Sequence, residues 1–520
     1  MTRPPSALYN PAPREAVLKD LLARSRSRLD ELPDAGLAEL LEDALYTERK
    51  RLLRSKPNEE TEHLDTLARA LVRGSRGDQM DAAMDLVMGW SDEIHGKFDP
   101  RTYRFATRIL PKALTGLLGG RPHSLSDLAP ERRLRVDGPI DTIRDLCSEA
   151  TVVLAPTHVS NLDSPLIGLA LHLAGLPPFV YGAGLNLFSN PLMGFFLRRL
   201  GAYTVDRRKQ AKLYKDVLKD YSVRAMVTGH HSLFFPGGTR SRSGLVEPTV
   251  KKGLLGTGIV AWQEMLEAGR EKPDVVVVPL TLSFQLTLEA ATLINDHLEE
   301  AGKQRFIIDD DEFAQPRRLA AFSRRVLDLD ASVVARFGDP VDCLGNPVSH
   351  DLRERAEQSK DRMRYVCDAQ GRVQRDSQRD RVYTDRLADT LIEAWPKGIT
   401  AMSTHVAAWV AWRMLEDRLQ TRDPFRVVRM PALSRRFSRK AYLERLDILL
   451  TNIKEDVRNG VYDADIPVTA RGLLDQALDR FDCYHRSHAL AAHGDDLMVE
   501  DPKLCLYYRN RLAHLDLEAR

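Results

Sequence analysis

The sequence is poor in the features that mark secreted, fibrous or nucleic-acid-binding proteins. It has five cysteines in 520 residues and no CxxC pair, which argues against a disulfide scaffold and fits a reducing compartment. The 76 basic and 74 acidic residues leave a net charge of +2, so no overall positive excess favours a nucleic acid as partner. With 31 glycines and 28 prolines the composition is ordinary, which excludes a collagen-like or wholly disordered chain.

Long hydrophobic runs are missing as well. The opening residues, MTRPPSALYNPAPREA, are polar and rich in proline, with no apolar core for a signal peptide. The most apolar stretch, 166–185, is interrupted by His172, Pro177 and Pro178, so it does not predict a spanning helix. No Walker sequence, GxGxxG fingerprint or GxSxG elbow is present, which removes the main support for nucleotide binding and serine hydrolysis.

Hydrophobic patterning predicts three regions. Residues 1–130 form a helical region, because the apolar residues between 37 and 45 recur at the spacing of one helix face. Residues 131–345 alternate short apolar runs with helical segments, which indicates an α/β domain with a mostly buried sheet. Residues 346–520 are again predicted to be helical.

Local breaks refine this division. Pro396 and the prolines near 424–431 are expected to interrupt the last helical region. The charged stretch 285–330, with acidic residues at 309–312, is interpreted as a solvated insertion before the final strand of the domain.

One short motif places a base near an acid. The apolar run TVVLAP ends just before His158, and Asp163 follows five residues later at the start of an apolar helix. On one continuous helix these side chains would point apart, so they can cooperate only across a strand-to-helix turn. An imidazole so placed can take a proton from an alcohol while the carboxylate fixes its tautomer. The structural alternative is that Asp163 caps the helix and His158 is an ordinary loop residue.

Two later segments concentrate positive charge. GAYTVDRRK (201–209) and FFPGGTRSRSG (234–244) each carry two arginines after a strand-like run, and the second is a glycine-rich turn. Amides and guanidinium groups in such turns can hold a phosphate. Residues 198–252 contain thirteen basic and four acidic residues, which indicates a local anion site, although the lysines at 212, 215 and 219 also fit an exposed helix face. The four arginines are Arg207, Arg208, Arg240 and Arg242.

These segments resemble, in order, the four motifs of the glycerolipid acyltransferase superfamily. HVSNLD is similar to the H-x4-D motif, GAYTVDR to the second, FPGGTRSRSG to the third and VVVVPL to the fourth. The resemblance covers roughly 135–345, and the helical flanks are similar to those of glycerol-3-phosphate and dihydroxyacetone-phosphate acyltransferases. It implies an α/β acyltransferase core with a mixed, mostly buried sheet, flanked by N-terminal and C-terminal helical regions.

The resemblance also implies roles for individual residues. His158 would be the general base and Asp163 its orienting partner, so that an acceptor hydroxyl attacks an acyl thioester. The implied substrate-binding residues are Arg207, Gly237, Gly238, Thr239, Arg240, Ser241, Arg242 and Pro279, the last shaping the pocket wall. It implies no metal and no cofactor other than acyl-CoA or acyl carrier protein as cosubstrate.

The chain departs from the family pattern at two positions. The glutamate usual in the third motif, thought to help bind the acceptor, is Gly237 here, and Thr204 replaces a common aromatic or aliphatic residue in the second. For the first departure three possibilities stay open: another carboxylate such as Glu247 substitutes, the acceptor is held differently, or activity is altered.

Three other features have competing interpretations. Cys483, His485, His488 and His493 are close enough in sequence for a zinc site, but an exposed helix face explains them equally well. VAAWVAW (406–412), with Trp409 and Trp412, fits a membrane interface or a core helix. The third is an apolar group beside paired arginines, which fits membrane or acyl-chain contact or the core; it comprises Phe188, Leu192, Phe195, Phe196, Arg198 and Arg199.

Together these observations predict a glycerol-3-phosphate O-acyltransferase of phospholipid biosynthesis. Its expected partners are glycerol 3-phosphate or a related lipid precursor, an acyl thioester carrier and a membrane surface, and not nucleic acid. We expect a cytoplasmic location, peripheral to the inner face of the cell membrane. The alternatives are acylation of 1-acylglycerol 3-phosphate or dihydroxyacetone phosphate, thioester hydrolysis, and a non-catalytic lipid- or membrane-binding protein.

Overall fold

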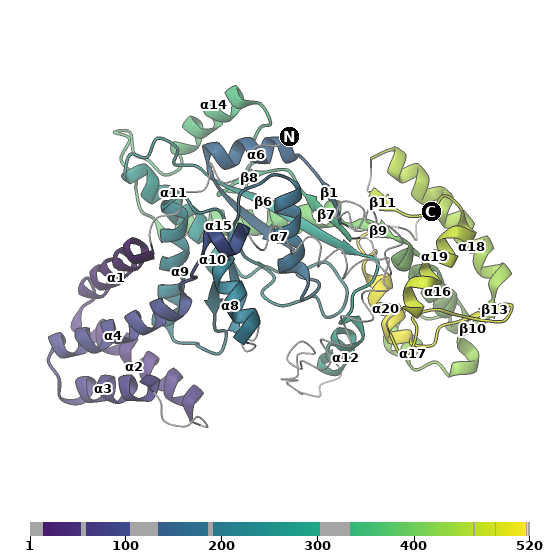
Figure 1. The fold of residues 1–520 in the computed structure, drawn as a ribbon, viewed down its shortest axis with the longest axis horizontal. Coiled ribbons are helices and arrows are strands. Elements are labelled where there is room, and N and C mark those ends of the chain that lie inside the picture. Colours follow the sequence, from purple (N-terminus) through teal and green to yellow (C-terminus); the bar gives the residue numbers. More distant parts are fainter. Residues whose placement is uncertain are drawn as a thin grey trace.

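A central β-sheet separates two helical regions in the computed structural model (Figure 1). The N-terminal helices lie to one side of the sheet and the elements from residue 400 onward to the other, whereas the helices between 352 and 398 lie against the sheet domain itself. The structure describes residues 14–53, 59–104, 134–185, 191–301, 333–460, 463–483, 485–515 and 517.

The sheet has eight strands and is mixed, as expected. Its order is β1-β7-β6-β2-β5-β3-β4, with β8 also paired to β6. Strands β6, β2, β5, β3 and β4 run parallel to one another, whereas β7 and β8 are antiparallel to β6. The strands are β1 (Leu134–Asp137), β2 (Thr151–Pro156), β3 (Val180–Gly184), β4 (Ala202–Val205), β5 (Ser232–Leu233), β6 (Val275–Phe284), β7 (Val333–Phe337) and β8 (Val341–Asp342).

Strands β2 and β6 form the middle of the sheet because both of their faces are apolar. Every residue of both strands is buried. Val152 and Leu154 of β2 pack into one core cluster, while Val153 and Ala155 pack into another. This alternation is what helices on both faces of a sheet require.

Pro279 lies inside β6, where a missing N–H would normally break a central strand. On the side of β6 that faces away from β2, the partner strand changes at this residue. Strand β8 pairs with Val276 and Val277, whereas β7 pairs from Leu280 onward. The carbonyl of Pro279 accepts the N–H of Gly338 at 2.8 Å, and no ladder donor is needed at this point. The strand therefore tolerates proline because its neighbours change at that residue; the expected role in a pocket wall stays a prediction.

Helices cover both faces of the sheet. Helices α6 and α7 pack in one core cluster with the sheet, and α9 and α11 contribute to the other clusters. The helices of this part of the chain are α6 (Ile140–Glu149), α7 (Asp163–Leu173), α8 (Pro191–Arg199), α9 (Lys212–Val227), α10 (Lys252–Leu255), α11 (Thr257–Glu267) and α12 (Ala290–Ala301).

The N-terminal helices dock on α9, which covers the sheet. They are α1 (Arg14–Asp30), α2 (Asp34–Leu52), α3 (Glu59–Arg73) and α4 (Arg76–Ile94). The predicted apolar face of α2 is confirmed, since Leu37, Leu40, Leu41 and Ala44 are all buried in the cluster shared with α9. Apolar spacing alone therefore identified the face that packs.

The C-terminal region is mostly helical, as expected, and its described residues also hold five short strands that the sequence did not predict. Strands of three residues are too short to show an alternating pattern. They are β9 (Thr400–Met402), β10 (Arg436–Ser438), β11 (Asp463–Asp465), β12 (Ala491–His493) and β13 (Asp496–Met498). The helices are α14 (Leu352–Met363), α15 (Ser377–Gly398), α16 (Ser403–Leu419), α17 (Pro424–Val428), η6 (Ala432–Arg435), α18 (Arg439–Arg458), α19 (Ala470–Asp482) and α20 (Pro502–Asn510).

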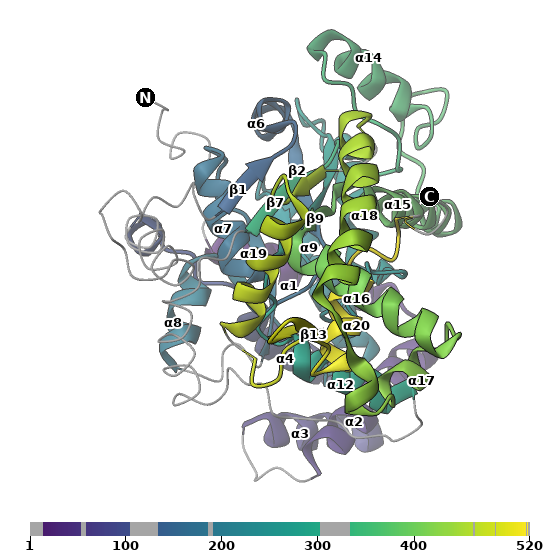
Figure 2. The same cartoon turned by 90° about the vertical axis from the view of Figure 1, so that its right-hand side faces the viewer.

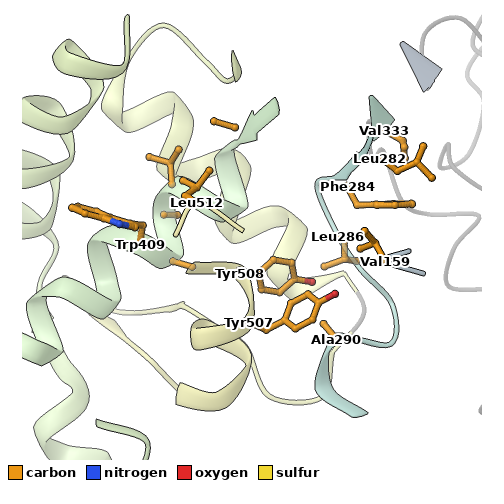
Figure 3. Packing of buried hydrophobic residues seen from close by; sticks show 14 of the residues in the cluster. Val159, Leu282, Phe284, Leu286, Ala290, Val333, Trp409, Tyr507, Tyr508 and Leu512 are labelled. Atoms are coloured by element: carbon orange, nitrogen blue, oxygen red, sulfur yellow. The ribbon is translucent and has the colours of Figure 1, made fainter. Parts of the chain in front are cut away.

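Helix α16 is the centre of this region, with α18, α19 and α20 around it (Figure 2). Trp409 and Trp412 of α16 are 7% and 1% exposed, so they belong to the core and are not available to a membrane. Tyr507 and Tyr508 of α20 pack beside Ala290 at the start of α12 (Figure 3). The C-terminal region and the sheet domain therefore share one core.

Two further sequence expectations can be placed only in part. In the described parts of the chain, no helix is both long and apolar enough to cross a membrane. The acidic run at 309–312, Phe188, and the side chains of Leu192 and Phe196 lie outside the described residues.

Candidate functional site

The sheet brings the motif segments to one edge. Strands β2, β5, β3 and β4 are parallel, so their carboxyl ends lie on the same side of the sheet. The turn after β2 carries His158, the turn after β5 carries Arg240, and the turn after β4 carries Arg207. Side chains as far apart in sequence as His158 and Arg240 thus reach one region.

His158 and Asp163 form the expected pair. Nδ1 of His158 lies 2.7 Å from Oδ2 of Asp163, the first residue of α7. The same carboxylate oxygen accepts the backbone N–H groups of Val159 and Ser160 at 2.6 and 3.0 Å. Because an ionised carboxylate only accepts, Nδ1 of His158 carries the proton and Nε2 keeps its lone pair. Asp163 is the first residue of α7 and not its N-cap, which is Leu162.

The two members of this pair differ in how deeply they are buried. The side chain of Asp163 is fully buried, whereas that of His158 is 17% exposed. The His158 ring stacks on Phe235, with ring centres 4.2 Å apart. Asp163 therefore holds the His158 ring from within the protein, while the ring itself remains reachable.

The third-motif segment holds the backbone of His158 from both sides. The carbonyl of His158 accepts the N–H of Ser241 at 2.8 Å, and its N–H donates to Oε1 of Glu247 at 2.5 Å. Glu247 is buried, and burial raises its pKa to about 7. His158 is thus fixed at its ring, its N–H and its carbonyl.

A second buried glutamate supports the same turn. Glu289, just before α12, accepts the hydroxyl of Ser160 at 2.9 Å and the N–H of Asn161 at 2.9 Å. Oε1 of Glu289 also lies 3.5 Å from Nη1 of Arg240. Burial raises the pKa of Glu289, and the charge of Arg240 opposes that rise. Glu289 therefore links the turn that carries the base to the turn that carries a candidate phosphate ligand.

The arginines after β4 differ in their surroundings. Arg208 donates from Nη2 and Nε to the two oxygens of Asp206, both at 3.0 Å. Within the described parts of the chain, Arg207 pairs with no carboxylate. Desolvation and the like charge of Arg240 lower the pKa of Arg207. Two guanidinium groups that repel each other, one of them without a counter-charge, form a candidate site for an anion.

The polar side chains of the third-motif turn differ in their partners and in their exposure. Arg242 is directed to Glu300 of α12, with which it forms an ion pair, so the structure joins it to α12 and not to Arg207. The hydroxyl of Ser241 donates to the carbonyl of Leu245 at 2.6 Å, while Thr239 is exposed.

The two glycines of this turn lie against long side chains. Gly238 has a left-handed φ of +78°, which favours glycine, and a Cβ there would lie 3.0 Å from Cγ of Lys251. Lys251 therefore brings another cation to the turn. Gly237 lies against Glu247: a Cβ added to Gly237 would lie 2.8 Å from Cγ of Glu247.

The C-terminal helix holds the far end of the third motif. Nδ2 of Asn510 donates to the carbonyl of Ser243 at 2.8 Å, and Nη1 of Arg511 donates to that of Gly244 at 3.3 Å. A Cβ at Gly244 would collide with the carbonyl of Tyr507. The last helix is thus in direct contact with the candidate site.

The N-terminal helices hold the second motif. Nζ of Lys209, a buried residue two positions after Arg207, lies 3.0 Å from Oε1 of Glu60 on α3 and also pairs with Glu93 on α4. Both helical regions therefore anchor turns of the candidate site.

The cysteine and histidines near the C-terminus do not converge. His485 is buried and lies 3.3 Å from the hydroxyl of Tyr508, whereas His488 and His493 both pair with Glu500. Across the described ranges no group of three or more histidine, cysteine or acidic side chains is placed to hold a metal ion.

Sequence reasoning missed Glu289 and Phe235 as members of the site. Glu289 lies 128 and 129 positions from its partners Asn161 and Ser160, and a glutamate at the start of a helix is ordinary. The only local signal for Phe235 is its place in the third motif. Neither position carries a pattern that identifies its partner.

Comparison with known proteins locates a family in the same segment. Residues 135–283 match the Acyltransferase family model. The chain is 30% identical over 155 residues to a glycerol-3-phosphate acyltransferase of Baumannia cicadellinicola, covering 29% of this chain and 18% of that protein. It is also 30% identical over 193 residues to the glycerol-3-phosphate acyltransferase of Pseudoalteromonas translucida, covering 36% of this chain and 21% of that protein.

The chain thus spans about a fifth of the length of the curated relatives that it matches. Among solved structures it is similar to the 1-acyl-sn-glycerophosphate acyltransferase PlsC of Thermotoga maritima, with 17% identity and a TM-score of 0.26. That match covers 57% of this chain and 85% of the other. Residues 135–283 thus match the Acyltransferase family model, and the chain is distantly similar to the glycerol-3-phosphate acyltransferases.

Proposed function

We propose that this protein is a glycerol-3-phosphate O-acyltransferase that takes fatty acyl groups from acyl-CoA or acyl carrier protein. The observation that carries the proposal is the juxtaposition of an oriented base, His158, with a neighbouring turn that bears guanidinium groups. The family match of residues 135–283 and the names of the two curated relatives support the choice of chemistry.

The reaction follows from the state of His158. Its Nε2, left unprotonated by the bond from Nδ1 to Asp163, accepts the proton of the acceptor hydroxyl as that oxygen attacks the thioester carbonyl. The C–S bond then breaks, the carrier leaves as a thiolate, and this thiolate takes the proton from His158 to become the free thiol. Because a buried carboxylate oxygen of Asp163 lies beside Nδ1, it stabilises the imidazolium that forms between these steps.

Arg207 and Arg240 supply the acceptor site in this proposal. A phosphate monoester relieves the repulsion between the two guanidinium groups and places its hydroxyl at a fixed distance from the base. Lys251, whose stem lies across Gly238, adds positive charge to the same turn. Water needs no phosphate clamp, so these cations favour acyl transfer over thioester hydrolysis.

The proposal extends to a membrane surface. Phe195 of α8 is 48% exposed, and the guanidinium of Arg199 lies 3.6 Å from the centre of its ring. An apolar group next to a cation suits the interface of an anionic lipid layer. We propose a cytoplasmic protein peripheral to the inner face of the cell membrane. Sedimentation with anionic vesicles tests this, and a protein left in the supernatant at all lipid concentrations contradicts it.

Thiol release from acyl-CoA, with and without glycerol 3-phosphate, tests the activity. We expect release only with acceptor, together with acylated glycerol phosphate as product. A strong preference for 1-acylglycerol 3-phosphate or dihydroxyacetone phosphate would select one of those acceptors. Equal release without any acceptor would indicate a hydrolase, and phospholipid binding without release from either carrier would indicate a non-catalytic protein.

A further inference from the structure

One buried carboxylate touches the candidate base and the glycine that departs from the family pattern. Glu247 is 8% exposed and lies in the loop that follows the third motif. Its Oε1 accepts the backbone N–H of His158 at 2.5 Å. A buried carboxylate that holds the backbone of a base constrains where the imidazole can lie.

Glu247 also fills the space beside Gly237. A Cβ added to Gly237 would lie 2.8 Å from Cγ and 3.4 Å from Oε1 of Glu247. Carbon atoms that are not bonded to each other do not approach to 2.8 Å, so a side chain at residue 237 and the present side chain at residue 247 exclude each other. Only one of the two positions can supply a carboxylate to this space.

From this mutual exclusion we infer that Glu247 supplies the carboxylate that the third motif lacks at Gly237. The side chain enters from ten residues further along the chain and ends against the turn of His158. Glu247 is a positioning residue, because it acts through the backbone of His158. The inference rests on the proposed function, since it assigns a part of that site.

The surroundings of Glu247 fit this role. The positive charge of Arg511, which follows α20, stabilises the carboxylate, whereas the nearby charge of Asp163 opposes its ionisation. The peptide of Gly238 is fixed by a 3.0 Å hydrogen bond from its N–H to the carbonyl of Phe235, so the turn beside Glu247 is itself closed. The carboxylate therefore sits between two fixed turns and joins them.

A swap of the two positions tests the inference. We expect Glu247→Ala to lower kcat for acyl transfer about 10- to 100-fold with a smaller change in KM, because the base is misplaced. Gly237→Glu alone should be as poor, because its side chain meets Glu247. Gly237→Glu combined with Glu247→Gly should recover at least tenfold over either single variant. Glu247→Gln, which keeps the shape and an oxygen acceptor, should lie closer to wild type than Glu247→Ala.

Glu271→Ala is the matched control, since Glu271 is an exposed glutamate on the loop before β6. It should leave kcat unchanged. Melting temperatures of all variants separate loss of positioning from loss of fold. A double variant no better than Gly237→Glu, or full kcat in Glu247→Ala, overturns the inference.

A readout without turnover distinguishes failure of the inference from failure of the proposed function. In protein labelled with ¹⁵N-histidine, the amide proton of His158 should resonate far downfield because it donates to a carboxylate. Glu247→Gln should move that signal upfield, and Glu271→Gln should not. If the protein shows this shift but acylates no glycerol phosphate, the proposed function is wrong while the role of Glu247 stands. An unmoved signal overturns the role of Glu247.

Discussion

Nδ1 of His158 lies 2.7 Å from a carboxylate oxygen of Asp163 that is fully buried, while the imidazole itself is partly exposed. The oxygen also accepts two backbone N–H groups, so its position is fixed by the turn and not by the histidine. A carboxylate held in this way determines which ring nitrogen faces the substrate.

Asp163→Asn therefore tests the orientation of the base. The amide can donate to Nδ1 and stabilise the wrong tautomer, so kcat should fall about 100-fold or more with little change in KM for glycerol 3-phosphate. Steady-state thiol release measures both constants. Asp141→Asn, at an exposed position on α6, is the control and should behave as wild type. An active Asp163→Asn enzyme would show that His158 is not the base.

Arg207 and Arg208 form a matched pair for acceptor binding. Arg207→Ala should raise KM for glycerol 3-phosphate at least tenfold, because it removes a guanidinium without a protein counter-charge. Arg208→Ala should change KM less than about threefold, because Arg208 is already paired with Asp206 on the protein surface. Equal effects of the two substitutions would contradict the assignment of the phosphate to Arg207.

Glu289→Ala should destabilise the fold and slow the reaction together. It leaves the hydroxyl of Ser160, the N–H of Asn161 and the guanidinium of Arg240 without their acceptor. Loss of such buried partners costs about 1–3 kcal/mol of unfolding free energy. Urea unfolding measures that loss, and a change in kcat with no change in stability would be inconsistent with this view.

Gly244→Ala should separate α20 from the third motif. Its φ of +82° is unfavourable for alanine, and the added Cβ collides with the carbonyl of Tyr507. We expect a lower melting temperature and lower acyl transfer. Gly269→Ala is the control, because Gly269 also has a positive φ but no atom within 4 Å of the added Cβ. If both variants lose activity equally, backbone strain and not contact with α20 is responsible.

Stability should fall as the pH is lowered from about 6.5 towards 4. Burial lowers the pKa of four histidines to about 4, so over this interval the unfolded chain binds protons that the folded chain does not. Each such group contributes a slope of about 1.4 kcal/mol per pH unit. They are His230, His231, His485 and His514.

Buried glutamates with raised pKa values act in the opposite sense. The raised pKa values of Glu247 and Glu289, and that of a third buried glutamate, Glu48, make the folded chain bind protons more readily than the unfolded chain, but the four histidines outnumber them. Urea titrations at pH 7, 6 and 5 measure the net effect. Unchanged stability across this series would show that the histidines do not remain neutral in the folded protein.

Local sequence was enough to predict the elements that position the site. TVVLAP became β2 with the expected bounds, and the apolar alternation from 131 to 345 became a mixed sheet. Such runs are informative because a strand that is buried on both faces must be apolar at nearly every position. The pairing of His158 with Asp163 was also predictable, since both lie on one turn.

The ion-pair partners of the arginines were not predictable from the sequence. Arg208 and Arg207 are neighbours in the chain, yet Asp206 pairs with the first and not with the second. Arg242 is part of the predicted cluster, but its ion pair is with Glu300 of α12. No periodicity encodes which of several adjacent cations finds a carboxylate, because that depends on the directions that the fold imposes on each side chain.

By itself the sequence determined the resemblance of residues 135–283 to the acyltransferases, the strands of the sheet and the turn that bears His158. The tertiary structure alone decided that Glu289 and Glu247 support that turn and that both helical flanks anchor the motifs, through Lys209 on one side and Arg511 on the other. The physical reason is that a turn is specified by its own few residues, whereas a buried charge is specified by whichever distant groups the packed chain brings within hydrogen-bonding distance.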